Sequence, residues 1–596
     1  MFICYIFHPR SAIHSGEPAE ITGRKWSLRV VRDETAGPYY PHAAEHLTSE
    51  GYRLFAGRLA GVPPSDQLPE QHAVSRPDAA DWRMEPEPDG SWLAFKFDRN
   101  TDIVSIASDL FLLQRWYYTQ QDGAWYFSNS LLYLCRQLPK RAEMDPRALP
   151  FMLMMGFLPH ELTPLQGISG LRGNQSLTVT AGQPRITLRR TLPVWTGHRP
   201  AEFGGPNGVI DMDRACTLVL SALREAVARE LQHAERVILT LSGGMDSRFL
   251  LGCAREVIPN ERFSTVTFGH PRSLDFRIGT GLARKLGVPF AALPMDTRPL
   301  DVLLSEAFPY REGMYQGYPD YPVAPMRAAL PPRTIVLSGY IGDLVFGSYD
   351  SDPAAFRTEA TDDLLCRTVL EDRRICFVPI REVLPLLSDP AGAERHVRTE
   401  FGRAPGRTLQ ERYLSWVFEN FMNRTNFALQ VDRDRAFYVA PFVHGGVLTV
   451  ASALAPALRR NEAALQSALR TGFPDLYSYP LKKCLGFRPD QSARLRRMLL
   501  RAWWGALSRL DDHVGTALGK PIFFHPRWNY AHYRDLFHGV HHDFVAGCLD
   551  ELRNIPYFDG RAMLNLRNRY VRNKRMDREL FRGLLTVWQW HRYNRS

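Results

Sequence analysis

The stretch Val237-Ile-Leu-Thr-Leu-Ser-Gly-Gly-Met-Asp-Ser247 decides the fold of this chain. Its first five residues form an apolar run typical of a buried parallel strand, and the pattern of residues 248–255 is helical. Two glycines and two serines at a strand-to-helix turn let successive backbone N–H groups converge on a phosphate at the helix N-terminus. The stretch therefore predicts a pyrophosphate-binding loop. The residues expected to contact the phosphates are Leu241, Ser242, Gly243, Gly244, Asp246 and Ser247.

This loop differs from the phosphate-binding loop of the common nucleotide triphosphatases. Their loop has the pattern GxxxxGK(S/T), which does not occur among the 596 residues, so the sequence does not support a kinase or a motor. An isolated Gly-Gly turn is usually structural, but the preceding strand and the complete SGGxDS string favour a phosphate-binding role here.

The segments around the loop alternate between helix and strand patterns. A helix is predicted before the loop, from Asp213 to about His233, and buried strands are predicted after it, over 264–268 and 334–337. Alternating helices and buried strands predict an α/β fold with a parallel sheet. Long helical patterns dominate from about residue 400 onward, so we expect a helical C-terminal region.

The first part of the chain has a different pattern. Short β-branched and aromatic runs separated by turn clusters indicate half-buried strands over 27–31, 52–55, 91–97 and 102–107. Residues 193–208 have the Gly and Pro content of a linker. The sequence therefore predicts two domains, a sheet-rich one over 1–195 and an α/β one over 209–596.

Composition narrows the class of protein. Hydrophobic residues make up 45% and charged residues 23% of the chain, as in soluble globular proteins. The eight cysteines include no CxxC pair, which fits reduced thiols rather than zinc or disulfides. No apolar window is long enough to span a membrane and no signal peptide is recognisable, so we expect a cytoplasmic protein. The formal charge of +11 would attract nucleic acid, acidic peptides or nucleotides and selects none of them.

Basic residues concentrate near the C-terminus, in segments 492–497 and 567–575. The apolar residues next to the first segment predict amphipathic helices with solvated basic faces, with binding of an acidic partner as the alternative. These apolar residues are Leu499, Leu500, Trp503 and Trp504.

Around the loop the sequence resembles the PP-loop ATP pyrophosphatases, and within them the asparagine-synthetase-like family. The resemblance implies an N-terminal Ntn-hydrolase-like, glutaminase-type β-sandwich followed by a PP-loop ATP-pyrophosphatase domain. It also implies ATP and Mg²⁺ as cofactors, with Phe268 and Gly339 as further ATP contacts. The segments that carry it are 90–98, 109–128, Phe268-Gly269 with Asp275 and 283–287, 338–349, 440–442 and 482–487.

Splitting ATP between its α and β phosphates requires magnesium, which prefers carboxylate and phosphate oxygens. By position in the family the magnesium ligands are Asp246 and Asp343, although each could instead cap a helix. A lysine would stabilise the charge that develops on the tetrahedral carbon. We expect Lys483 in this catalytic role because it lies nearest the Gly-Phe pair, with Lys482 as the alternative.

The glutaminase half departs from the family pattern. Its nucleophile is a cysteine that becomes residue 1 after removal of the initiator methionine. This sequence has Phe2 at that place, and Cys4 cannot substitute without processing. Ammonia from glutamine is therefore not the expected nucleophile.

A second departure is Tyr340, which stands where asparagine synthetase has the first glutamate of its SGEGSDE segment. A tyrosine there resembles β-lactam synthetase, so Tyr340 is either catalytic or a packing residue. The glutamate that works with that tyrosine is replaced by Phe437, with Asp432 and Asp434 close enough to stand in.

Without a glutaminase nucleophile, an amine already on the substrate is expected to attack the acyl-adenylate. The chain most resembles lasso-peptide cyclases, which join a peptide's N-terminal amine to an Asp or Glu side chain and so make a macrolactam. This implies a precursor-peptide substrate and a leader-peptidase or leader-recognition partner, with no nucleic acid and no membrane. The alternatives are a β-lactam-synthetase-like small-molecule cyclase, an ammonia-dependent asparagine synthetase and, last, a catalytically silent scaffold.

Overall fold

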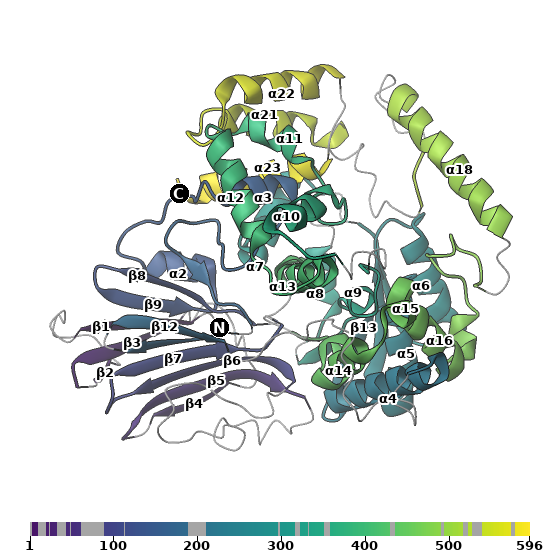
Figure 1. The fold of residues 1–596 in the computed structure, drawn as a ribbon, viewed down its shortest axis with the longest axis horizontal. Coiled ribbons are helices and arrows are strands. Elements are labelled where there is room, and N and C mark those ends of the chain that lie inside the picture. Colours follow the sequence, from purple (N-terminus) through teal and green to yellow (C-terminus); the bar gives the residue numbers. More distant parts are fainter. Residues whose placement is uncertain are drawn as a thin grey trace.

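A computed structural model shows two stacked sheets at one end of the molecule, a parallel sheet with helices at the other, and further helices beside both (Figure 1). It describes residues 3–9, 20–22, 24–32, 43–47, 49–60, 89–111, 114–173, 175–180, 182–188, 210–295, 298–315, 322–331, 333–350, 358–429, 436–489, 494–515, 523–526, 539–573 and 578–595.

The first domain contains two six-stranded antiparallel sheets, and all four strands predicted there are present. One sheet has the order β10-β8-β9-β1-β3-β2: β1 (Ile3–Pro9), β2 (Glu20–Thr22), β3 (Trp26–Arg32), β8 (Tyr117–Gln121), β9 (Ala124–Ser128) and β10 (Ser169–Gly170). The other has the order β12-β11-β7-β6-β5-β4: β4 (Ala43–Leu47), β5 (Gly51–Leu59), β6 (Gly90–Asp98), β7 (Ile103–Ser108), β11 (Gln175–Thr180) and β12 (Gln183–Leu188).

The two sheets face each other across one hydrophobic core, so this part of the chain is a β-sandwich. The alternation of large apolar residues along β6 and β7 places Phe95 and Ile106 in that core. Tyr5 of the opposite sheet stacks on Phe95, with ring centroids 3.8 Å apart. The phenyl ring of Phe437, from the second half of the chain, also belongs to this core and is 6% exposed.

The second half is built on a five-stranded parallel sheet, as predicted. Its order is β15-β14-β13-β16-β17: β13 (Arg236–Thr240), β14 (Phe263–Phe268), β15 (Phe290–Leu293), β16 (Thr334–Leu337) and β17 (Ala436–Val439). The helices that flank the functional part of this sheet are α4 (Met212–Leu231), α5 (Asp246–Val257) and α6 (Leu274–Lys285). The predicted helix before the loop is α4, and β15 and β17 were not predicted.

Helices dominate the remainder of the chain. They are α7 (Leu300–Arg311), α8 (Val323–Ala329), α9 (Gly342–Val345), α10 (Asp362–Glu371), α11 (Ile380–Val383), α12 (Pro390–Gly402), α13 (Leu409–Leu429), α14 (Gly445–Ala453), α15 (Pro456–Arg459), α16 (Ala463–Gly472), α17 (Pro474–Tyr477), α18 (Arg494–Leu510), α21 (His542–Leu552), α22 (Gly560–Asn573) and α23 (Arg578–Tyr593). In the part of the chain that the structure describes, none of the helices has both the length and the apolarity needed to cross a membrane.

The two halves share packing rather than being separate bodies. Helices α2 (Leu131–Gln137) and α3 (Leu149–Met154) follow β9, and their apolar side chains belong to the same buried cluster as those of α23. Gly583 of α23 lies so close to α3 that a Cβ atom there would be 2.5 Å from the Met152 carbonyl oxygen. Residues 189–209, which contain the predicted linker, lie outside the described residues.

Candidate active site

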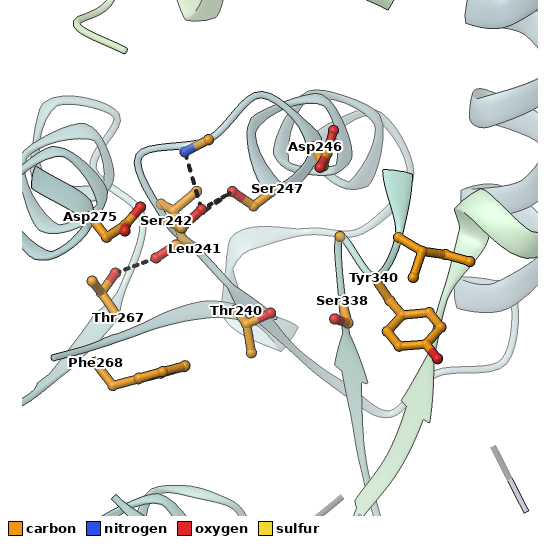
Figure 2. Close-up of a pocket in the computed structure, with 13 residues that line it drawn as sticks. Thr240, Leu241, Ser242, Asp246, Ser247, Thr267, Phe268, Asp275, Ser338 and Tyr340 are labelled. Atoms are coloured by element: carbon orange, nitrogen blue, oxygen red, sulfur yellow. Dashed lines mark hydrogen bonds between the residues drawn. The ribbon is translucent and has the colours of Figure 1, made fainter. Parts of the chain in front are cut away.

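A pocket of about 340 Å³ lies at the carboxyl ends of β13, β14 and β16. This is the edge at which parallel α/β sheets bind ligands. The structure brings most of the predicted ATP contacts together here, as Figure 2 shows. The lining residues are Thr240, Leu241, Ser242, Gly244, Asp246, Ser247, Thr267, Phe268, Asp275, Ser338, Gly339, Tyr340 and Ile341.

The Ser242–Ser247 loop is held by its own side chains. The Ser242 and Ser247 hydroxyls share a 3.1 Å hydrogen bond, and the backbone nitrogen of Gly244 donates to the Ser242 Oγ over 3.1 Å (Figure 2). The backbone nitrogen of Ser242 donates to the Ser247 Oγ. These hydrogen bonds fix the turn that leads into α5.

One expectation about this loop needs correction, because the glycine amides do not point together into the pocket. The Gly243 nitrogen donates to the Asp275 Oδ1 over 3.0 Å, and the Gly244 nitrogen donates to Ser242. Buried amides take side-chain oxygens as partners wherever these are in reach. The donors left for a phosphate are the first N–H groups of α5, since the Met245 N-cap supplies no side-chain acceptor, together with the serine hydroxyls.

The two lysine candidates occupy different places. The ammonium of Lys482 forms an ion pair with Asp275, the residue that also accepts from Gly243. The ammonium of Lys483 contacts the Glu462 carboxylate over 3.0 Å and donates to the Asn461 carbonyl oxygen over 2.9 Å. Lys482 therefore supports the phosphate loop, while Lys483 lies on the side of the acidic residues described next.

Asp246 and Asp343, the predicted metal ligands, lie in one cluster of negative charge. Burial raises the pKa of Asp246 well above its usual value, the charges of Asp343 and Glu462 raise it further, and Lys483 lowers it. Burial likewise raises the pKa of Asp343, against a hydrogen bond from the Leu344 nitrogen. The Asp343 residue is exposed to solvent, although enough protein atoms surround its carboxylate to disfavour the charged form.

These carboxylates fit a magnesium ion. A carboxylate whose pKa is raised by a neighbouring carboxylate is stabilised by a divalent cation, and Mg²⁺ needs only one or two carboxylates when phosphates complete its shell. No cluster of three or more His, Cys, Asp or Glu side chains suited to a metal was found among the described residues. Asp246 and Asp343 are thus the residues that would hold the ion, shared with phosphate oxygens.

The turn that carries Asp343 is strained and tightly packed. Ile341 has φ 49°, a left-handed conformation that is unfavourable for a β-branched residue. A Cβ atom on Gly342 would lie 2.8 Å from the Asp246 Cγ, and one on Gly339 would lie 3.0 Å from the Asp246 Cβ. Glycines at these two positions let the turn approach α5, and strain of this kind is common at ligand sites.

Sequence reasoning missed residues that position the site. The buried guanidinium of Arg248 donates to three carbonyl oxygens, those of Leu476, Tyr479 and Pro480, over 2.6–2.9 Å. It thereby ties α5 to the segment that leads into Lys482. Burial lowers its pKa to about 10. The position of an arginine directly after the SGGxDS string could have indicated this positioning role. Which carbonyl groups it binds depends on the tertiary fold. Glu462, the partner of Lys483, carries no signal in the sequence.

Three residues bear on the narrower function. Tyr340 is 4% exposed and lines the pocket, with its ring directed away from the phosphate loop (Figure 2). Phe437 packs into the β-sandwich core, while Asp432 and Asp434 lie outside the described residues. Cys4 is fully buried in β1, and burial raises the pKa of its thiol far above the usual value. Phe2 also lies outside the described residues.

Comparison with known proteins gives a match to one family model and to several individual proteins. Residues 218–501 match the family model described as asparagine synthase. A protein of Methanocaldococcus jannaschii, provisionally named asparagine synthetase (glutamine-hydrolyzing) 2, is 23% identical over 279 residues, which are 46% of this chain and 52% of that protein. The carboxyethyl-arginine beta-lactam-synthase of Streptomyces clavuligerus is 27% identical over 198 residues, which are 33% of this chain and 37% of that enzyme.

The aligned stretches thus span about half, or less, of these relatives' own lengths. Among solved structures, the glutamine phosphoribosylpyrophosphate amidotransferase from B. subtilis complexed with ADP and GMP matches over 58% of this chain and 71% of its own. It is 10% identical with a TM-score of 0.18, a value too low to establish a common fold.

Proposed function

We propose that the chain is an ATP-dependent ligase that forms a C–N bond and releases AMP and pyrophosphate, because residues 218–501 match the family model described as asparagine synthase. The observation that carries this proposal is the pocket at the end of β13. Ser242, Ser247 and Asp246 line it at the N-terminus of α5. The charges of Asp343 and Lys483 act on Asp246 from beside the pocket. Lys482 forms an ion pair with the lining residue Asp275. Each of these groups has a task either in splitting ATP between its α and β phosphates or in the amide-forming step that follows.

The first step makes an acyl-adenylate. A substrate carboxylate oxygen attacks the α-phosphorus of ATP, and the bond to the β-phosphate oxygen breaks. The leaving pyrophosphate is received by the helix amides and by the hydroxyls of Ser242 and Ser247. Asp246 and Asp343 would hold a magnesium ion, which would supply positive charge to the phosphate oxygens.

The second step forms the amide. An amine attacks the acyl carbon, AMP leaves with the electron pair of the acyl–oxygen bond, and the amine gives up a proton. The Lys483 ammonium stabilises the tetrahedral oxyanion as a compact point charge. Tyr340 lines the pocket with its ring directed away from the phosphate loop, so we assign it to the acyl end of the substrate.

For the substrate we propose a precursor peptide whose Asp or Glu side chain is joined to its own N-terminal amine, which gives a macrolactam. The burial of Cys4 supports the view that the attacking amine is not ammonia released from glutamine, because a protonated thiol inside a core is not a nucleophile. Phe437 in the sandwich core supports a peptide over a β-lactam precursor, because the position holds no acid to act on a small amine. A cytoplasmic enzyme that works beside a leader-peptidase or leader-recognition protein would fit this role.

Two alternative functions act through the same adenylating site: a small-molecule β-lactam-type cyclase and an ammonia-dependent asparagine synthetase. The 27% identity to the beta-lactam-synthase over 198 residues favours the first of these alternatives. All three functions predict release of AMP, so they are distinguished by the substrate that supports this release and by the amide that is formed.

The experiment offers the purified chain Mg-ATP with three substrates in parallel. They are a peptide with a free N-terminus and an internal Asp or Glu, a small β-amino acid, and aspartate with ammonium. The proposal expects AMP release with the peptide and a peptide product lighter by one water and resistant to aminopeptidase. Release of AMP only with the β-amino acid or with aspartate plus ammonium would assign one of the alternatives and reject the macrolactam.

A further inference from the structure

Helix α18 presents an apolar surface to solvent. Its side chains Leu495, Met498, Leu499, Trp503 and Leu510 are 49–61% exposed. At 100° per residue they fall on one face, which Ala502 and Ala506 complete. The helix has 17 residues and is therefore about 25 Å long, the length of a surface that could hold a peptide rather than a metabolite. This set of residues is called the α18 face below.

The α18 face is unusual for an amphipathic helix, which turns its apolar side toward the protein. Here the opposite side of the helix is apolar as well, since Trp504 and the half-buried Leu500 and Leu507 lie there. Among the residues that the structure describes, half of the large hydrophobics found exposed lie between Leu495 and Val514, while the others are scattered. The expected solvated basic residues are present on α18, since Arg496, Arg501 and Arg509 are exposed, but large apolar side chains share the exposed surface of the helix.

Charge at the edges of the α18 face indicates what could cover it. The helix contains five arginines and no acidic residue. At 100° per residue the exposed Arg496 and Arg501 lie at the two edges of the face, and the exposed Arg509 lies among the apolar side chains. A second copy of the same helix would bring like charges together, which is unfavourable. An apolar segment flanked by Asp and Glu would match both the apolar stripe and the positive charge.

The helix is attached directly to the candidate active site. The Arg497 guanidinium lies 3.7 Å from the Cys484 Sγ, in the turn that carries both lysines. On the body-facing side, Trp504 packs on His525, and the Leu274 nitrogen at the start of α6 donates to the Pro526 carbonyl oxygen. Figure 1 shows α18 at the rim of the molecule, on the side of α6.

We propose that the α18 face is a docking site for an acidic amphipathic segment of the peptide substrate, which it holds next to the adenylating pocket. Binding at this surface requires neither ATP nor turnover, but the identity of the occupant as substrate rests on the proposed function. The α18 face would supply affinity through apolar contacts and selectivity through the arginines. An anionic membrane is a different class of occupant and is an outcome of the test.

The test measures fluorescence anisotropy of a synthetic helical peptide with leucines on one side and glutamates on the other. The protein carries Asp246→Asn, so that no turnover occurs. We expect saturable binding that weakens with salt, and at least about tenfold weaker binding when Leu499→Ser and Trp503→Ser are added. Ile186→Ser, a change at an exposed apolar residue of β12, is the matched control and should leave binding unchanged.

A charge exchange makes the test specific. With Arg496→Glu and Arg501→Glu, we expect the glutamate peptide to bind at least about tenfold more weakly and a lysine version of the same peptide to bind better. Equal binding by the wild-type and Leu499/Trp503 variants would overturn the proposal. So would binding to phosphatidylserine-containing vesicles without binding to the peptide. Failure to make AMP in the wild-type protein would reject the proposed function and leave this binding result intact.

Discussion

The backbone nitrogen of Lys482 donates a 2.9 Å hydrogen bond to the carbonyl oxygen of Gly243. This bond joins the phosphate loop to a turn far away in the sequence. The ion pair of Lys482 with Asp275, which accepts from the Gly243 nitrogen, reinforces the same junction. The neighbouring Lys483 is thereby held near the carboxylate of Asp246, whose pKa its charge lowers.

Substitutions of the two lysines should therefore have different kinetic effects. We expect Lys483→Ala to bind ATP nearly normally but to form product about 10²–10³ times more slowly, because one oriented cation is lost at the oxyanion. Lys482→Ala should mainly raise the KM for ATP, because the phosphate loop loses its support. Steady-state kinetics with separate determination of kcat and KM for ATP distinguishes the two effects.

Arginine variants provide the control for this pair. Lys483→Arg should restore little activity, since a planar guanidinium does not replace a compact ammonium. If Lys482→Ala loses product formation while Lys483→Ala stays active, the catalytic role moves to Lys482. If both alanine variants are active, neither lysine stabilises the oxyanion.

The first domain should not hydrolyse glutamine. We expect glutamine neither to yield glutamate nor to stimulate the reaction, and Cys4→Ser to be as active as the wild-type protein, because the buried thiol stays protonated. A coupled glutamate assay on the pure protein checks this expectation. Glutamate release that disappears in Cys4→Ser would contradict it.

Stability should depend on pH through His444. Its Nε2 lies 2.7 Å from a Glu230 carboxylate oxygen and its Nδ1 lies 3.5 Å from Asp89. Burial opposes the charged ring, but the hydrogen bond and charge of Glu230, with that of Asp89, outweigh burial and raise the pKa of His444. The stabilisation that charged His444 provides is complete at pH values below the pKa of His444 in the unfolded chain. It is lost as the pH rises through the higher pKa of His444 in the folded protein.

The variant His444→Gln should therefore lower the Tm more at pH 5.5 than at a pH well above the folded pKa. Thermal unfolding of both proteins across this range measures the difference. A Tm difference that stays constant with pH, or grows toward high pH, would show that His444 is not charged in the folded protein.

The fold was predictable where local pattern and tertiary role agree. The apolar run of β13 before two glycines indicated both the parallel sheet and its ligand-binding edge, and the structure contains both. The strands β15 and β17 were missed because β15 has no β-branched residue and β17 has one, whereas the equally short β16 has three. Phe437 of β17 packs into the core of the other domain, a contact that no local pattern predicts.

The candidate site was predictable to a similar extent. Four residues of the SGGxDS string line the pocket because a tight turn places them together, whereas Gly243 of the same string does not line it. The four are Ser242, Gly244, Asp246 and Ser247. The partners of the lysines, Asp275 and Glu462, are distant in sequence and are selected by tertiary packing. For the same reason the hydrogen bond from the Gly243 amide to Asp275 could not be predicted, whereas the acceptor of the Gly244 amide, Ser242, is local in sequence.

Asp246→Asn and Asp343→Asn should each abolish AMP formation while the protein stays folded. Each change removes a charged magnesium ligand. Each also removes one member of a cluster of mutually repelling carboxylates, so the Tm should be unchanged or higher than in the wild-type protein. Circular dichroism and thermal unfolding provide the control. Wild-type-like turnover in both variants would contradict the metal assignment.

The central claim, that this pocket cleaves ATP between its α and β phosphates to activate a carboxylate, is tested most directly with ATP labelled at the α-phosphate. The chain is incubated with magnesium and the peptide substrate, and labelled nucleotides and pyrophosphate are quantified together with the product. We predict AMP, pyrophosphate and product in equal amounts, with none of the three from Asp246→Asn. Labelled ADP with free phosphate, or product formed without AMP, would contradict the account.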